Sequence, residues 1–112
     1  MNAQPICLNE QVKQKVFNFF EAYYSGDRLK VYSYLDTSFQ RKVPLNYFLI
    51  HPSYEIDMGR LLSITQIEYK QDDKLALAEC NIEIQGKLRT VVLDLKYDFG
   101  GWKLEGESVF RA

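Results

Sequence analysis

The side chains best suited to acid–base chemistry gather in one short segment near the middle of the chain. The only histidine, His51, opens this segment, which continues through Glu55 and Asp57. An imidazole titrates near neutral pH and carboxylates accept protons, so these three side chains are the candidate general acids and bases. The structural alternative is that His51 is a loop residue beside Pro52, which cannot continue a helix. The residue types alone leave both interpretations open.

Three further acids lie in alternating stretches that predict β-strands. Glu79, Glu83 and Asp94 have the opposite parity to the apolar row of their strands. Because successive strand side chains point to opposite faces, we expect these acids to face solvent and to take no part in catalysis.

Metal, phosphate and nucleophile chemistry lack the residue patterns that they require. One histidine and two distant cysteines cannot complete a usual zinc set, and no acidic run has the spacing of a calcium loop. The glycines form no phosphate-binding run. Cys7 and Cys80 are expected to be free thiols, and no base lies near Cys80 in the sequence. We therefore expect no metal and no cofactor.

Aromatic residues are plentiful, with eight tyrosines, seven phenylalanines and one tryptophan. Four of the tyrosines lie in one aromatic stretch, at positions 23, 24, 32 and 34. A buried tyrosine usually packs its ring in the core and leaves its hydroxyl at the edge of a pocket. Core packing is therefore one interpretation, and contact with a bound ligand is the other. For the ligand interpretation, the candidate binding residues are Tyr23, Tyr32, Tyr54 and Trp102.

Length and charge are those of one ordinary domain. The chain has 112 residues, of which 14 are basic and 15 acidic. It is long enough to bury a core without disulfides, and it has no net field that favours nucleic acid. Its start does not read as an export signal, and no apolar run reaches the about 18 residues that a membrane span needs. We expect a cytoplasmic protein, or an exported one if an upstream signal has been removed.

The first part of the chain has the periodicity of helices. Apolar residues recur at three- and four-residue steps over 9–25, and a second apolar stripe covers 27–36. Asn9 is suited to cap the first helix. Gly26 can take the left-handed conformation that ends it, and Asp27 is suited to cap the second.

Two prolines bracket a further short helix. Pro44 is well placed to start a helix over 45–50, and Pro52 cannot continue it. The preceding residues, 38–43, are mostly polar and predict a connection without regular structure.

From residue 61 the apolar period changes to two, which is typical of half-buried strands. The phase slips near Thr65 and Gln66, which predicts a bulge. Short turn-like connections between the alternating stretches indicate an antiparallel meander. The predicted strands cover about 61–70, 74–85, 87–99 and 102–110.

These elements, in this order, resemble a known superfamily. The stretch VFNFFEAYYSGDRLKVYSYLDTSF looks like the opening of the nuclear-transport-factor-like, or cystatin-like, cone-shaped superfamily. The closing FGGWKL is similar to the last hairpin of that superfamily, and the resemblance spans about residues 9–110. It implies an α+β fold in which N-terminal helices pack in the concave face of a curved antiparallel sheet. We expect residues 1–8 to be a flexible N-terminus and residues 9–112 to form a single cone-fold domain.

The resemblance leaves the function open, because the superfamily includes both enzymes and binding proteins. Its enzymes, such as ketosteroid isomerase and polyketide cyclases, use an Asp or His inside the cone with the help of a Tyr. The segment after the short helix rims the mouth of the cone in related folds, which makes His51 and Asp57 candidate catalytic residues. Tyr23 is the candidate for the assisting tyrosine. Its non-catalytic members include transport adaptors, extracytoplasmic domains of penicillin-binding proteins and secretion-system components.

The leading hypothesis is a non-catalytic module that binds a small apolar ligand or a protein partner, because the strand acids are expected to point away from the interior. The alternatives are a small isomerase, cyclase or dehydratase with its site at the cone mouth, and an extracytoplasmic domain of an envelope assembly.

The outer face of the sheet predicts a homodimer. Members of the superfamily often pair through this face, and Leu88, Thr90 and Val92 lie on it among charged residues. The alternative is that these side chains only satisfy strand propensity and need no partner.

Overall fold

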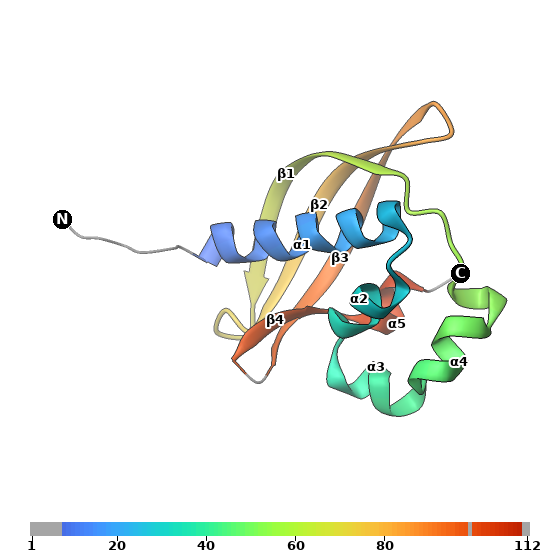
Figure 1. The fold of residues 1–112 in the computed structure, drawn as a ribbon. Helices are drawn as coiled ribbons and strands as arrows, with labels where there is room; N and C mark the ends of the chain where they lie inside the picture. Colours follow the sequence, from blue (N-terminus) through green and yellow to red (C-terminus); the bar gives the residue numbers. More distant parts are fainter. Residues whose placement is uncertain (1–7, 99, 111–112) are drawn as a thin grey trace.

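The computed structural model describes residues 8–98 and 100–110. Within them, four strands form one curved antiparallel sheet in the order β1-β2-β3-β4, so each strand pairs with its neighbour in the sequence (Figure 1). This confirms the antiparallel meander. The strands are β1 (Arg60–Lys70), β2 (Leu75–Ile84), β3 (Lys87–Asp98) and β4 (Gly101–Leu104).

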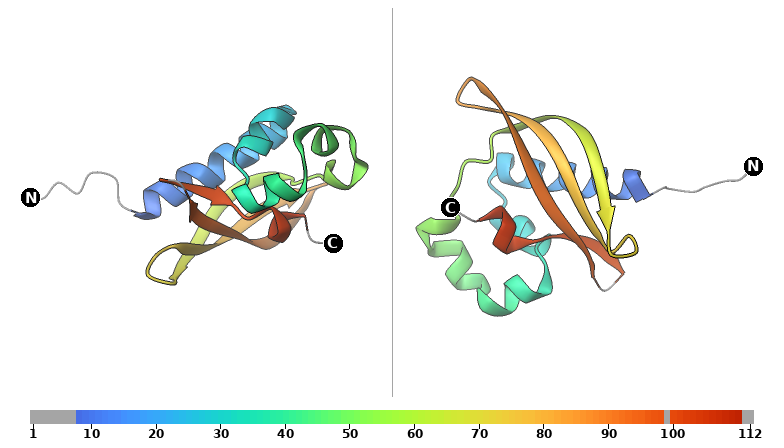
Figure 2. Two further views of the ribbon diagram at one scale, coloured as in Figure 1. Left: turned by 90° about the horizontal axis from the view of Figure 1, so that it is seen from below. Right: turned by 180° about the vertical axis from the view of Figure 1, so that it is seen from behind.

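The helices lie on one side of the sheet, as Figure 2 shows in its left view. The long helix α1 crosses the sheet face, and the short helices that follow it form a cap beside it (Figure 1). The fold is therefore α+β, as predicted. The helices are α1 (Leu8–Ser25), α2 (Arg28–Ser33), α3 (Thr37–Lys42), α4 (Leu45–Ile50), the 3-10 turn η1 (Pro52–Tyr54) and α5 (Gly106–Val109). None of the helices in the described residues is long and apolar enough to cross a membrane.

The turn between α1 and α2 confirms the predicted hinge. Gly26 has a φ of 79°, in the left-handed region that favours glycine. The side chain of Asp27 accepts a hydrogen bond from the Lys30 N–H at 3.1 Å, which caps α2.

The predicted cap at Asn9 is wrong, because α1 already begins at Leu8. The Asn9 side chain instead accepts a hydrogen bond from the Tyr69 hydroxyl at 2.6 Å. Apart from Leu8, the predicted flexible N-terminus lies outside the described residues.

The predicted connection over 38–43 is wrong, because Thr37–Lys42 forms α3. The helix forms because Asp36 caps its N-terminus: the Asp36 carboxylate accepts a hydrogen bond from the Phe39 N–H at 3.4 Å. This bond stabilises the first turn of a helix that the polar sequence alone does not predict. Phe39 is the buried residue of this helix. The predicted helix over 45–50 is confirmed as α4.

The last predicted strand, 102–110, is too long. The β4 strand ends at Leu104 and the chain turns into α5. The Gly106 N–H donates to the Asp36 carboxylate at 2.9 Å, which bends the chain out of the sheet. A Cβ on Gly106 would overlap the ring of Phe39, so only glycine allows this approach.

Strand β1 carries two irregularities. Its register against β2 shifts between Leu61 and Ser63 and again between Ile64 and Gln66. The second shift confirms the predicted bulge, and the first adds another. As a result, the ladder between β1 and β2 is interrupted at Leu62 and at Thr65.

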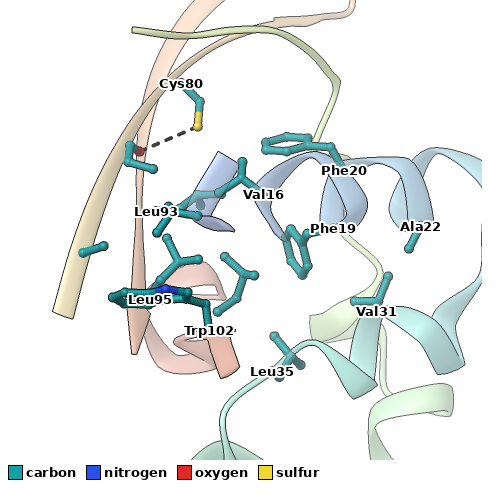
Figure 3. Close-up of a cluster of buried hydrophobic side chains, with 14 of the residues drawn as sticks. Val16, Phe19, Phe20, Ala22, Val31, Leu35, Cys80, Leu93, Leu95 and Trp102 are labelled. Carbon is teal, nitrogen blue, oxygen red and sulfur yellow. Dashed lines mark hydrogen bonds between the residues drawn. The ribbon is translucent and has the colours of Figure 1, made fainter. Parts of the chain in front are cut away.

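Buried side chains occupy the space between α1 and the sheet. In Figure 3, Val16 and Phe19 of α1 lie toward Leu93 and Leu95 of β3. Phe19 and Leu95 are fully buried, and so is Cys80 of β2. The predicted apolar row of β3 is confirmed at its centre, whereas Tyr97 is 44% exposed and Phe99 lies outside the described residues.

A second, aromatic cluster fills the cap. Phe39 stacks on Phe110 with ring centroids 5.6 Å apart, and Phe48 stacks on Tyr54 at 5.2 Å. Asp36 is the buried charged residue among the described residues, and Lys96 Nζ lies 3.4 Å from its carboxylate. Asp36 therefore ties the cap to the last strands.

Candidate functional site

His51 has a structural role on the side of the cap. Its Nδ1 accepts a hydrogen bond from the Ser53 N–H at 3.2 Å, and its ring stacks on Tyr47 with centroids 4.6 Å apart. This geometry fits a loop histidine at a helix stop. Glu55, which follows it, lies 3.8 Å from the Arg28 guanidinium and is largely exposed.

Tyr23 and Tyr54 are brought together, but not as a catalytic pair. The Tyr23 hydroxyl donates to the backbone carbonyl of Tyr54 at 3.3 Å. Burial raises the pKa of Tyr23 well above its ordinary value, and the nearby Arg28 only partly opposes this. The Tyr23 phenol therefore stays protonated at neutral pH and joins α1 to the cap.

Tyr32 also serves the cap. Its hydroxyl donates to the Val43 carbonyl at 2.7 Å, and its ring lies 5.2 Å from that of Phe48. Burial raises the pKa of Tyr32 as well. Three of the four predicted ligand residues thus belong to the packing of the cap.

Trp102, the fourth, lies on the opposite side of α1 from the loop that carries Asp57. It is buried in the core, with its ring edge-on to Tyr97 at 5.3 Å, and it forms part of the floor of a hollow of about 400 Å³ between α1 and β4. Within the described residues its indole N–H has no hydrogen-bond partner. The indole nitrogen is covered by protein atoms, so it is not open to a ligand in that hollow.

Asp57 lines a surface hollow at the end of α1. Its carboxylate accepts from the Gly59 N–H at 2.9 Å. The hollow measures about 470 Å³ and lies between the end of α1, residues 56–60 and the β2–β3 turn at 83–86. Tyr23 also lines it, so the structure brings two of the three predicted catalytic residues to one hollow. Its wall includes an ion pair of 3.1 Å between Arg60 and Glu83.

This hollow continues along α1 as a groove. A second hollow shares Tyr24, Gly59 and Arg60 with it, and a third shares Phe17 and Leu61 with the second. Together they follow one side of α1 from residue 10 to residue 24 and face residues 56–64 of the chain. We call this surface the α1–β1 groove.

Three large apolar side chains line or edge the groove and remain exposed. Phe17 is 54% exposed, Tyr24 is 71% exposed and Leu62 is 47% exposed. Isolated exposed apolar residues are ordinary, but apolar side chains that gather along a groove mark an interaction surface. This surface was not predicted from the sequence. The available signal was Phe17 itself, which directly follows Val16 of the buried stripe, because neighbouring helix residues point in different directions.

The described residues hold no group of three or more His, Cys, Asp or Glu side chains placed to bind a metal ion. Glu79, Glu83 and Asp94 of the sheet keep partial exposure and lie on the parity opposite to the buried row. The buried thiol of Cys80 has its pKa raised to about 12, mainly by burial and also by the charge of Glu79. None of these groups forms an acid–base or nucleophilic constellation in the part of the chain that the structure describes.

Comparisons of the chain with protein-family models, with curated proteins and with solved structures gave no match. What the fold and the groove themselves define is an α+β domain with a buried core and a surface groove between a helix and an edge strand, with exposed apolar side chains along polar walls.

Proposed function

We propose that this protein is a non-catalytic interaction module whose α1–β1 groove binds a segment of a partner protein. The observation that carries the proposal is the exposure of Phe17, Tyr24 and Leu62 along one continuous groove. Apolar anchors between polar walls are the usual composition of a protein-binding surface.

The likeness to the cone-shaped superfamily is part of the proposal. Its support is the order of helices and strands, together with a curved sheet that has its helices on one face. Non-catalytic members of that superfamily act as adaptors, which agrees with a role in binding.

The packing of the interior disfavours the enzyme alternative. An acid or base that works in a cone needs a place for substrate beside it. The buried carboxylate of Asp36 accepts from two backbone N–H groups and faces Lys96, and the Tyr23 hydroxyl is used by the Tyr54 carbonyl. These groups are committed to the fold.

The length of the groove favours a protein segment over a small apolar ligand. From residue 10 to residue 24, α1 rises by about 21 Å at 1.5 Å per residue. One hollow at the end of the groove already has the about 470 Å³ of a small-molecule site. A small ligand would occupy that hollow and leave Phe17 and Leu62 uncovered.

Selection from a displayed library of random peptides of about 18 residues tests the proposal. The library is selected on the wild-type protein and depleted on a Phe17→Ser/Leu62→Ser variant. We expect clones that bind the wild type and a Leu29→Ser/Ile50→Ser control, which changes two exposed apolar residues outside the groove. Their Kd should rise at least tenfold on the groove variant.

The proposal is wrong if every recovered clone binds the groove variant and the wild type equally. It is also wrong if 1-anilinonaphthalene-8-sulfonate, a small apolar probe, binds in a groove-dependent way while no peptide does. That second result would favour the small-ligand hypothesis.

A further inference from the structure

We infer that the partner segment is an amphipathic helix whose apolar stripe is flanked by basic residues. This inference rests on the proposed function and adds the chemistry of the partner. It follows from the charge of the groove walls, from the bulges of β1 and from the spacing of the exposed aromatics.

The groove is locally acidic in a chain that is nearly neutral. Its walls carry four acids, Glu10, Glu21, Asp57 and Glu83, and two bases, Lys13 and Arg60. The ion pair between Arg60 and Glu83 removes one charge of each sign from this count, which leaves three acids and one base. The whole chain has 15 acidic and 14 basic residues, so the groove, with two more acids than bases, is more acidic than the rest of the chain. A partner with basic flanks is the complement of such walls.

The bulges of β1 argue against an added strand as the partner. The register shifts leave Leu62 and Thr65 without a paired residue on β2, beside the groove. A bulged edge twists away from regular pairing, and bulges are one way in which proteins protect an edge strand. A partner on this surface therefore meets side chains such as Leu62, and not a continuous row of backbone N–H and C=O groups.

The exposed aromatics of α1 have the spacing of helix-on-helix packing. Phe17 and Tyr24 are seven residues apart, which is about 10.5 Å along a helix axis. A helix laid along α1 has its own apolar residues at i, i+3, i+4 and i+7, over the same distance. This is the helix-in-groove mode of recognition.

Three synthetic 18-residue peptides test the inference on the full chain. The first has leucines at i, i+3, i+4 and i+7 with lysines beside them, and the second replaces every lysine by glutamate. The third has the composition of the first with leucine and lysine in alternation, which suits a strand. Binding is measured by fluorescence anisotropy at low and at physiological salt, because attraction between charges weakens as salt rises.

We expect the first peptide to bind at least tenfold more tightly than either of the others. A Glu10→Lys/Glu21→Lys variant should weaken it at least fivefold. The matched control, Glu68→Lys/Asp98→Lys, makes the same change in charge outside the groove and should leave the Kd within twofold.

Equal binding of the lysine and glutamate peptides, or equal weakening by the control variant, overturns the basic character of the partner. Equal or tighter binding of the alternating peptide overturns its helical form. Absence of binding by all three overturns the inference as a whole. The proposed function is judged separately by the library, because a groove-dependent clone of acidic or extended type leaves it standing.

Discussion

Phe17 and Phe19 lie two residues apart on α1, yet Phe19 is fully buried and Phe17 is 54% exposed. The first belongs to the α1–β1 groove and the second to the core between α1 and the sheet (Figure 3). The two regions use the same kind of residue with different consequences. A buried ring in the core stabilises the fold, whereas a half-exposed ring in the groove is expected to contribute little to stability. A residue whose loss leaves the fold intact can be kept for binding.

Truncation of the two phenylalanines gives the largest contrast. We expect Phe19→Ala to lower the free energy of unfolding by about 4 kcal/mol, because it removes a buried ring and leaves a cavity. Phe17→Ala should change it by less than about 0.5 kcal/mol, as surface substitutions usually do. Urea denaturation followed by circular dichroism measures both. Similar losses for the two variants would mean that Phe17 is part of the core.

Substitution of the buried Asp36 should show how much its hydrogen bonds stabilise the interior. We expect Asp36→Ala to cost about 3 kcal/mol, because it leaves the Phe39 and Gly106 N–H groups without their acceptor. It also removes the nearer of the two carboxylates beside Lys96, which keeps only Glu105. Asp36→Asn should cost less, since one acceptor oxygen remains. A urea midpoint for Asp36→Ala equal to that of the wild type would exclude this role.

Gly59 lies where the interior meets the groove. It has a φ of +73°, and a Cβ there would come 2.6 Å from the Glu83 carbonyl oxygen. We expect Gly59→Ala to cost about 2 kcal/mol through backbone strain and this overlap. Gly26→Ala is the matched control: its φ of +79° is similar but it has open space around it, so its loss should be about 1 kcal/mol. Equal losses in urea would show that the overlap is relieved by a small shift of residues 56–60.

The buried thiol of Cys80 should make the stability of the folded protein depend on pH. Burial is the main reason that its pKa in the folded protein is raised from the ordinary value of 9.0 to about 12. A raised pKa means that the folded state holds its proton longer than the unfolded state does. The contribution of Cys80 to stability is therefore complete below about pH 9 and is lost as the pH rises to about 12.

Urea titrations at several pH values measure this loss, which should be smaller in Cys80→Ala. In a Cys7→Ser background, where Cys80 is the one remaining cysteine, a thiol reagent at pH 8 should react slowly before unfolding and rapidly after it. Rapid reaction of the folded variant would contradict the burial of this thiol.

Substitutions on the outer face of the sheet should have the smallest effect on the free energy of unfolding. Leu88 and Val92 are exposed on that face, and we predict that it joins two copies of the chain. Light scattering at tens of micromolar should give twice the 13.2 kDa of one chain. Val92→Lys should return the mass to that of a monomer while its unfolding free energy stays within about 0.5 kcal/mol of the wild type. A wild-type monomer would leave this face as ordinary surface.

Periodic patterns predicted the parts of the fold that depend on one stretch of sequence. The stripe of α1, the hinge at Gly26 and the alternation of β2 were all predictable, because each element carries its own signal. The helix α3 was not, since its polar sequence becomes helical through Asp36, whose second partner is Gly106 at the far end of the chain.

The groove was unpredictable for a similar reason. Phe17 and Leu62 are far apart in the sequence and meet at one groove only through the packing of α1 beside β1. For Tyr32 and Tyr54, residue type predicted a binding site where the structure has a packed cap. A tyrosine near a helix end suits a pocket and a packed cap equally well.

The bond from Gly106 to Asp36 also bears on how the protein is made. The two residues are 70 positions apart in the sequence. A ribosome releases the N-terminal helices long before it has synthesised Gly106. Until then, α3 lacks the partner that fixes its cap to the sheet, and the rings of Phe39 and Phe48 lack Phe110. The cap can therefore close only after Gly106 and Phe110 have been synthesised and have left the ribosome, and until then its aromatic side chains stay open to chaperones.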